Sequence, residues 1–217
     1  MDGLFDMQEI FAGFESAFSC QAHVLCGQVI DMSAYQNVVK KAKDCYLYCL
    51  SRKKAKHFPK YILMHADEYT SFLFFLSREA WRVGCVELAE LAYLVNRRLN
   101  GFDCFYTREM PDVFHLEHPL GSVIGQAKFG EYLVVYQAVS VGGDLRFRYP
   151  EFGQGVALFA KSTVIGSAKV GSNCAIGAGV QIYGGAIPSD TAVSIRDGLG
   201  VTPSPLSWSV QERFFKT

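Results

Sequence analysis

The sequence lacks the features that would place the protein on a nucleic acid or in a membrane. Lys+Arg and Asp+Glu each number 21 among 217 residues, so the formal net charge is zero, whereas nucleic-acid-binding proteins normally carry a basic excess. No uncharged apolar run is long enough to span a bilayer. Asp2, Asp6 and Glu9 stand where a signal peptide would be basic. We therefore expect a soluble, cytoplasmic protein with no nucleic-acid partner and no membrane span.

The sequence also lacks the cysteine and histidine spacing of a disulfide framework or a zinc site. The seven cysteines are odd in number and scattered, and Cys45 and Cys49 are four residues apart rather than in a CxxC pair. We interpret all seven as reduced, mostly buried side chains. Only His115 and His118 follow residue 101, whereas a zinc site built from histidines needs three imidazoles. We expect no metal.

Residues 1–101 have the periodicity of a helical domain. Apolar residues at steps of three and four predict helices over about 4–25, 31–55 and 70–100, the last divided at Gly84. The buried stripe of the last segment would contain Leu73, Phe74, Leu76, Ala80, Trp81, Leu88, Leu91, Ala92 and Val95. A basic run in the second helix is interpreted as a solvated face, with a phosphate-binding patch as the alternative. It consists of Lys40, Lys41, Lys43, Arg52, Lys53, Lys54 and Lys56.

From His118 to Ile187 the chain has a six-residue period. One phase contains Val123, Phe129, Val135 and Val141, and after a polar break a second contains Phe152, Leu158, Val164, Val170, Ile176 and Ile182. Neither a helix nor an isolated strand gives this period. A β-helix does, because short strands stack coil upon coil and each periodic side chain points into a narrow core. We predict an α+β protein: a helical domain (1–101), a parallel β-helix of hexapeptide repeats (102–200) and a C-terminal tail (201–217).

Several motifs in the repeat region resemble those of the serine acetyltransferase group of hexapeptide-repeat acyltransferases. The resemblance covers residues 67–190 and is tightest over 103–187. It is carried by Glu117-His118 with the following Pro-Leu-Gly-Ser-Val-Ile-Gly-Gln, by Val141-Gly142-Gly143, by Arg148-Tyr149-Pro150 and by the block 164–179. It implies a left-handed β-helix, assembly into a trimer or a hexamer, and acetyl-CoA bound in a groove between two subunits.

The resemblance also implies roles for particular residues. His118 would be the general base that removes the proton from an acceptor hydroxyl, a task suited to imidazole, which in general titrates near neutrality. Asp103, 15 residues earlier and so nearly one coil away, would orient the imidazole. Glu117, Arg148 and Tyr149 would contact the acceptor. Residues expected to line the acetyl-CoA site are Gly142, Gly143, Ala160, Lys161 and Ala178.

The sequence departs from serine acetyltransferases around the acceptor. Tyr149 stands where those enzymes have a second histidine, the loop 143–149 is about three residues shorter, and their acidic residue in the helical half has no clear counterpart. The Arg-Tyr-Pro version is more similar to relatives that acetylate sugar hydroxyls in surface-polysaccharide pathways. We therefore expect an acetyl-CoA-dependent O-acetyltransferase acting on a sugar hydroxyl, with serine O-acetylation in cysteine biosynthesis and a non-catalytic trimeric scaffold as alternatives.

Overall fold

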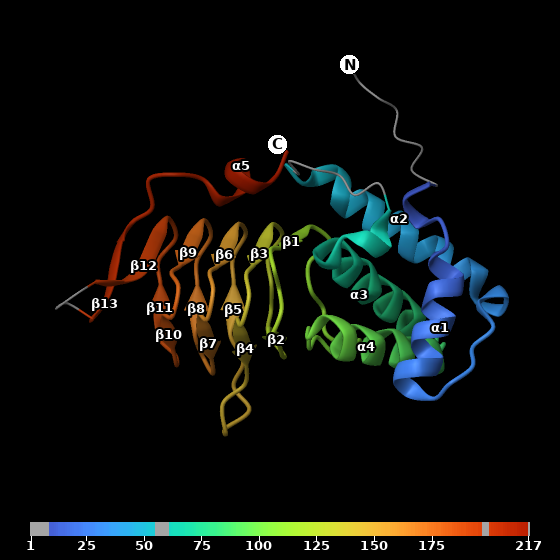
Figure 1. Ribbon diagram of the computed structural model, residues 1–217. Coiled ribbons are helices and arrows are strands. Elements are labelled where there is room, and N and C mark those ends of the chain that lie inside the picture. Colours follow the sequence, from blue (N-terminus) through green and yellow to red (C-terminus); the bar gives the residue numbers. More distant parts are fainter. Residues whose placement is uncertain (1–8, 55–60, 197–199, 217) are drawn as a thin grey trace, which may run out of the picture.

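The computed structural model describes residues 9–54, 61–196 and 200–216. Helices form one end of the molecule and a stack of short strands forms the other (Figure 1). Leu4 of the first predicted helix and Ala55 of the second lie outside the described residues. Among those described, no helix is both long and apolar enough to cross a membrane.

The helical end contains four α-helices and three short 3-10 turns among the described residues. Gly84, with a φ of 79°, separates α3 from α4 as predicted, because this left-handed backbone favours glycine. Asp31 caps the turn before α2 by accepting a hydrogen bond from the Ser33 N–H. The elements are η1 (Glu9–Phe11), α1 (Phe14–Cys26), η2 (Met32–Tyr35), α2 (Gln36–Arg52), η3 (Ile62–Met64), α3 (Ala66–Arg82) and α4 (Val86–Asn100).

Helix α3 is the centre of this end, because it packs against both α2 and α4. Its buried Phe72 ring contacts three further buried rings, those of Phe11, Phe14 and Tyr46. Burial of side chains of this size contributes about 2–3 kcal/mol each, which makes the cluster the main support of the helical end. The predicted burial is wrong for one residue, Trp81, which is 42% exposed.

The strands that follow the helical end form a parallel β-helix, and this confirms the predicted fold. Three sheets run along its length, in the orders β1-β3-β6-β9-β12-β13, β10-β7-β4-β2 and β11-β8-β5. The strands are β1 (Phe114–Leu116), β2 (Val123–Ile124), β3 (Leu133–Val135), β4 (Ser140–Gly142), β5 (Glu151–Phe152), β6 (Val156–Leu158), β7 (Thr163–Ile165), β8 (Lys169–Val170), β9 (Cys174–Ile176), β10 (Gln181–Ile182), β11 (Ala186–Ile187), β12 (Thr191–Arg196) and β13 (Gly200–Pro205).

The six-residue phase is the inward-facing column of the coil. Leu158 of β6 lies between Val135 of β3 and Ile176 of β9 in parallel register, and all three are buried. The prediction is wrong at Val123, which is 46% exposed. Its neighbour Ile124, 1% exposed, takes the inward place and pairs with Val141, because the first coil has turns of unequal length.

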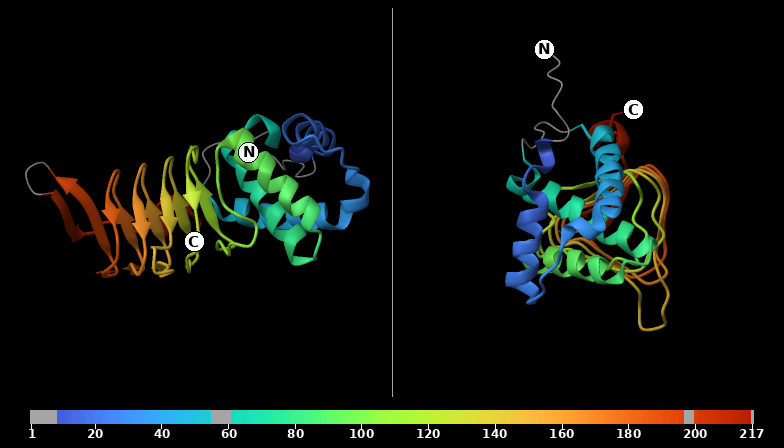
Figure 2. Two further views of the ribbon diagram at one scale, coloured as in Figure 1. Left: turned by 90° about the horizontal axis from the view of Figure 1, so that it is seen from below. Right: turned by 90° about the vertical axis from the view of Figure 1, so that its right-hand side faces the viewer.

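The polar break between the two phases is a loop that leaves the coil. It joins β4 to β5 and projects from the stack, as the view along the coil axis makes clear (Figure 2, right). At its tip Leu145 is fully exposed and Phe147 is 79% exposed.

The chain after the last coil turns back along the outside of the stack. β13 pairs antiparallel with β12, and the short helix α5 (Val210–Phe214) follows. The buried side chains of Val210 and Phe215 pack on the outer face of the coil against Val113, Val134 and Ala157. The C-terminal segment thereby returns to the helical end, next to α2 (Figure 1).

Candidate functional site

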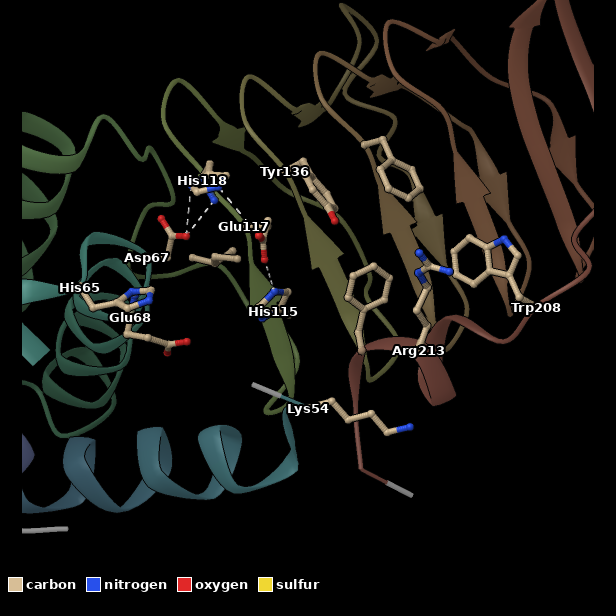
Figure 3. Close-up of a pocket in the computed structure, with 13 residues that line it drawn as sticks. Lys54, His65, Asp67, Glu68, His115, Glu117, His118, Tyr136, Trp208 and Arg213 are labelled. Atoms are coloured by element: carbon tan, nitrogen blue, oxygen red, sulfur yellow. Dashed lines mark hydrogen bonds and ion pairs between the residues drawn. The ribbon is translucent and has the colours of Figure 1, made fainter. Parts of the chain in front are cut away.

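A pocket of about 710 Å³ lies where the helical end, the first coils and the C-terminal segment meet (Figure 3). Its volume falls within the range of small-molecule sites. Charged and aromatic side chains make up most of its wall, which is formed by Lys54, His65, Asp67, Glu68, His115, Leu116, Glu117, His118, Tyr136, Phe159, Trp208, Arg213 and Phe214.

His118 occupies a corner of the coil between β1 and β2. Its φ is 49°, an uncommon value for a residue other than glycine. The carboxylate of Asp67, from the first turn of α3, accepts a hydrogen bond from the His118 backbone N–H at 3.0 Å and lies 3.6 Å from the ring Nδ1. The His118 side chain is 75% exposed. The corner therefore presents an imidazole that is open to ligands and held from behind by a carboxylate.

Glu117 connects His118 to a second imidazole. One carboxylate oxygen of Glu117 lies 2.6 Å from the His115 Nε2, and the other lies 3.9 Å from the His118 Nε2. The hydrogen bond from His115 is the main reason that the pKa of Glu117 is below its ordinary value. The Nδ1 of His115 is buried and has no hydrogen-bond partner among the described residues. Glu117 thus remains ionised beside the exposed imidazole.

The structure does not bring Asp103 to His118. The Asp103 carboxylate accepts a hydrogen bond from the Tyr93 hydroxyl at 2.9 Å and pairs with Arg97 at 3.2 Å. Its backbone bridges Val123, on the sheet that follows the His118 corner. The acids beside the imidazole in this structure are therefore Asp67 and Glu117, and not the predicted orienting residue.

Glu68, one of the acidic residues that line the pocket, belongs to a buried ion pair. Lys53 Nζ lies 2.9 Å from a carboxylate oxygen of Glu68, and the Tyr46 hydroxyl donates to the same group at 3.2 Å. Burial favours a higher pKa for Glu68, but the charge and hydrogen bond of Lys53 outweigh it, so the pKa of Glu68 is lowered. Lys53 is 1% exposed, so its assignment to a solvated basic face is wrong.

Arg148 and Tyr149 lie on the projecting loop and are not part of this pocket. The Arg148 guanidinium pairs with Asp144 of the same loop, with Nε 2.7 Å from the carboxylate, and this hydrogen bond lowers the pKa of Asp144. Tyr149 is 43% exposed. The two predicted acceptor contacts are therefore separated from His118 within one chain.

The predicted acetyl-CoA residues divide between two corners of the coil. Ala160, Lys161 and Ala178 lie on the corner that follows β6 and β9, the edge along which His118 follows β1. Ala178 is exposed and Ala160 half-buried, so small side chains leave room along this edge.

Gly142 and Gly143 lie on the next corner, where β4 leads into the loop. A Cβ at Gly142 would meet nothing within 4 Å, so its backbone is open to a ligand. A Cβ at Gly143 would lie 2.7 Å from the Tyr149 ring, so the absence of a side chain there lets that ring pack on the loop.

The contributions of the helical end and of the C-terminal segment to the pocket were not predictable from sequence motifs. Asp67 contacts a residue 51 positions away, and its sequence context suggests only a favourable charge at a helix N-terminus. Trp208, Arg213 and Phe214 belong to the tail, for which no role was predicted. The aromatic and basic closing sequence was the only signal for them.

Within residues 9–54, 61–196 and 200–216 there is no arrangement typical of metal binding. The described residues contain no group of three or more His, Cys, Asp or Glu side chains placed to hold an ion. The seven cysteines are free, and three of them, Cys49, Cys104 and Cys174, are buried.

Comparison with known proteins relates this chain to serine acetyltransferases. It is 32% identical over 120 residues to a serine acetyltransferase of Synechococcus elongatus, which covers 50% of this chain and 49% of that protein. It is 25% identical over 138 residues to one of Staphylococcus xylosus, which covers 62% and 64%. The chain thus spans between about half and two thirds of the length of these relatives. No family model matches the chain.

Solved structures share the fold over a larger part of the chain. A Neisseria gonorrhoeae serine acetyltransferase in complex with serine has a TM-score of 0.68 at 22% identity, and covers 87% of this chain and 83% of that one. A serine acetyltransferase in complex with CoA has a TM-score of 0.60 at 17% identity, and covers 80% and 72%. The order of helical end and parallel β-helix is the same in these proteins, which confirms the fold class.

Proposed function

We propose that this protein is an acetyl-CoA-dependent O-acetyltransferase whose acceptor is the hydroxyl of serine. The observation that carries the proposal is the exposed imidazole of His118, which lies between the carboxylates of Asp67 and Glu117 at a coil corner. A base of this kind needs a free ring nitrogen and groups that stabilise its charged form. The resemblance to serine acetyltransferases in sequence and fold supports the same reaction.

The proposed acceptor differs from the sugar hydroxyl expected from the loop sequence. The relatives and solved structures described above are serine acetyltransferases, and one of those structures is a complex with serine. Asp67 of α3 contacts His118, so an acidic residue of the helical half reaches the site, although the sequence offered no clear counterpart for one. The carboxylates of Asp67 and Glu117 suit the ammonium group of serine. Both findings favour serine, our alternative, over a sugar.

The proposed reaction needs no covalent enzyme intermediate. His118 accepts the proton of the serine hydroxyl while the oxygen attacks the carbonyl carbon of the thioester. The new C–O bond forms, the C–S bond breaks, and the CoA sulfur leaves with the proton carried by the imidazolium. Glu117, kept ionised by His115, and Asp67 stabilise that imidazolium. The thioester itself would bind along the His118 edge, beside Ala160 and Ala178.

A homotrimer, alone or paired as a hexamer, would complete this site. Arg148 and Tyr149 are separated from His118 in one chain, on a loop that projects from the coil with Leu145 fully exposed. An exposed apolar loop tip suits burial against another subunit. In the proposed assembly the loop of one subunit reaches the site of the next, where Arg148 and Tyr149 contact the acceptor.

The test is the release of CoA from acetyl-CoA by wild-type protein, with L-serine, nucleotide sugars and oligosaccharides as separate acceptors. We expect release with serine, and a loss of a hundredfold or more in turnover for His118→Ala with unchanged assembly. His23→Ala, an exposed histidine of α1, is the control and should retain full activity. Near-normal turnover of His118→Ala would refute the proposed base. A protein without measurable CoA binding by calorimetry would instead be the scaffold of our second alternative.

A further inference from the structure

The two ends of the pocket have opposite charge. Asp67, Glu68 and Glu117 form the end next to His118, whereas Arg213 lies at the other end, beside Trp208 (Figure 3). Lys54 also lines the pocket, and its ammonium contacts the carbonyl of Glu212, the residue before Arg213. Aromatic side chains, including Tyr136 and Phe159 with ring centroids 5.0 Å apart, form the wall between them. A ligand that fits the whole pocket would therefore carry an anionic group away from the reacting hydroxyl.

The backbone that carries Arg213 is fixed by its neighbours on both sides. On one side, the Val210 N–H donates to the Asn173 side chain at 2.9 Å, and the buried Val210 packs on the coil. On the other, Phe215 forms an antiparallel bridge with Lys53, and the Lys54 N–H donates to the Phe214 carbonyl at 2.8 Å. The cationic end of the pocket is thus built by packed segments, so little order has to be gained when a ligand binds.

The guanidinium of Arg213 is stacked on an aromatic ring and forms no ion pair with the described residues. It lies over the Trp208 ring, 5.2 Å from the centroid. No carboxylate of the described residues lies within ion-pair distance of Arg213, whereas Arg148, on the projecting loop outside the pocket, is paired with Asp144. A stacked guanidinium keeps its N–H groups free to bind a carboxylate or a phosphate in a forked geometry. The Lys54 ammonium, which donates one hydrogen bond to the Glu212 carbonyl, adds a second positive charge.

We propose that Arg213, with Lys54, binds the anionic group of the acceptor while His118 receives its hydroxyl proton at the other end of the pocket. The C-terminal segment then forms an acceptor subsite, and its ligand is a carboxylate or a phosphate on the hydroxyl compound. This inference rests on the proposed function and deepens it. For serine, the group recognised is the α-carboxylate.

The experiment compares Arg213→Gln with wild type on L-serine and on L-serinamide, which has the same hydroxyl and amine but no carboxylate. We expect the KM for serine to rise about tenfold or more in the variant, as for the loss of a hydrogen bond to a charged group, with kcat little changed. The KM for serinamide should be the same in both proteins. Arg213→Lys should retain part of the affinity, and Lys128→Gln, an exposed cation outside the pocket, should have no effect.

Each other outcome of these assays distinguishes the proposed subsite from an alternative. A rise in the KM for acetyl-CoA alone would mean that Arg213 binds a phosphate of the co-substrate. Equal changes for serine and serinamide, or no change for either, would mean that the carboxylate is not recognised there. If wild type acetylates neither compound, the proposed acceptor is wrong, and titration with inorganic phosphate then tests the subsite. Binding that is lost in Arg213→Gln supports an anion subsite, and equal binding in both proteins refutes it.

Discussion

Lys53 and Glu68 join the helical end to the pocket wall, and their ion pair gives the clearest test of how this junction is stabilised. Their side chains are 1% and 6% exposed, and the two charged groups lie 2.9 Å apart. Glu68→Gln keeps the shape of the side chain but leaves the Lys53 ammonium buried without a compensating charge. Breaking a buried pair in this way costs about 3–5 kcal/mol. We expect this loss in the free energy of unfolding, a large part of the roughly 5–15 kcal/mol typical of a folded protein.

The double variant Lys53→Met/Glu68→Leu separates the cost of an unpaired charge from the value of the pair. Both charges are then absent, and the side chains that replace them are apolar and of similar volume. Such replacements are often neutral or stabilising, although the Tyr46 hydroxyl loses its acceptor at a cost of about 1 kcal/mol. The double variant should therefore be more stable than Glu68→Gln. Urea unfolding at pH 7 and one fixed protein concentration measures all three proteins.

The pH dependence of stability provides a second measurement on the same pair. Because the pKa of Glu68 is lowered from 4.5, its contribution is present above pH 4.5 and is lost as the pH falls through the lower, folded-state pKa. The shift of Lys53 has the opposite sign: burial lowers its pKa, but Glu68 and the neighbouring groups together raise it more. Its contribution is therefore present below pH 10.5 and is lost as the pH rises through the higher, folded-state pKa. Both losses should be absent from the double variant. A cost below about 1 kcal/mol for Glu68→Gln, or a double variant no more stable than Glu68→Gln, would refute the reasoning.

Three further predictions concern the coil and its edge. Gly171→Ala should destabilise the protein by more than 1 kcal/mol in urea unfolding, because the new Cβ would lie 2.5 Å from the Ser189 backbone nitrogen, whereas Gly142→Ala enters open space and should be neutral. Ser162→Ala should leave the unfolding midpoint unchanged or raise it, because the buried hydroxyl has no partner among the described residues; a clear loss would mean that it has one. His115→Leu should shift the acid limb of the rate profile to higher pH, because the pKa of Glu117 loses the hydrogen bond that lowers it; an unchanged limb would exclude Glu117 from that ionisation.

The coil was predictable because its period is local and regular. Where each side of a turn takes six residues, one inward position predicts the next, as at Leu158, Val164 and Val170, all buried. The prediction failed at Val123 because the first coil is irregular. From Leu116 to Ile124 the inward positions are eight residues apart, and from there to Phe129 they are five apart. A fixed period cannot anticipate a turn that changes length.

The partner of His118 was not predictable by the same means. Counting 15 residues back to Asp103 assumes a shorter turn than the one that forms, because the Asp103 backbone pairs with Val123, 20 residues on and five residues beyond His118. The carboxylate that does reach the imidazole belongs to Asp67, and its position depends on how α3 packs against the coil. Contacts between separate parts of a fold leave no period in the sequence. The motifs therefore singled out His118, whereas its contact with Asp67 depends on tertiary packing.

The position of the C-terminal segment also depends on tertiary packing, and it explains why the pocket has two charged ends. Local sequence supplies an aromatic and basic ending whose composition suits a solvated tail as well as a packed one. Burial of Phe215 in the outer cluster and its bridge to Lys53 decide between them. The same bridge keeps Lys53 out of water, so that it pairs with Glu68 instead of joining a basic face. One packing event therefore places Arg213 in the pocket and also buries the cation that lowers the pKa of Glu68 in the opposite wall.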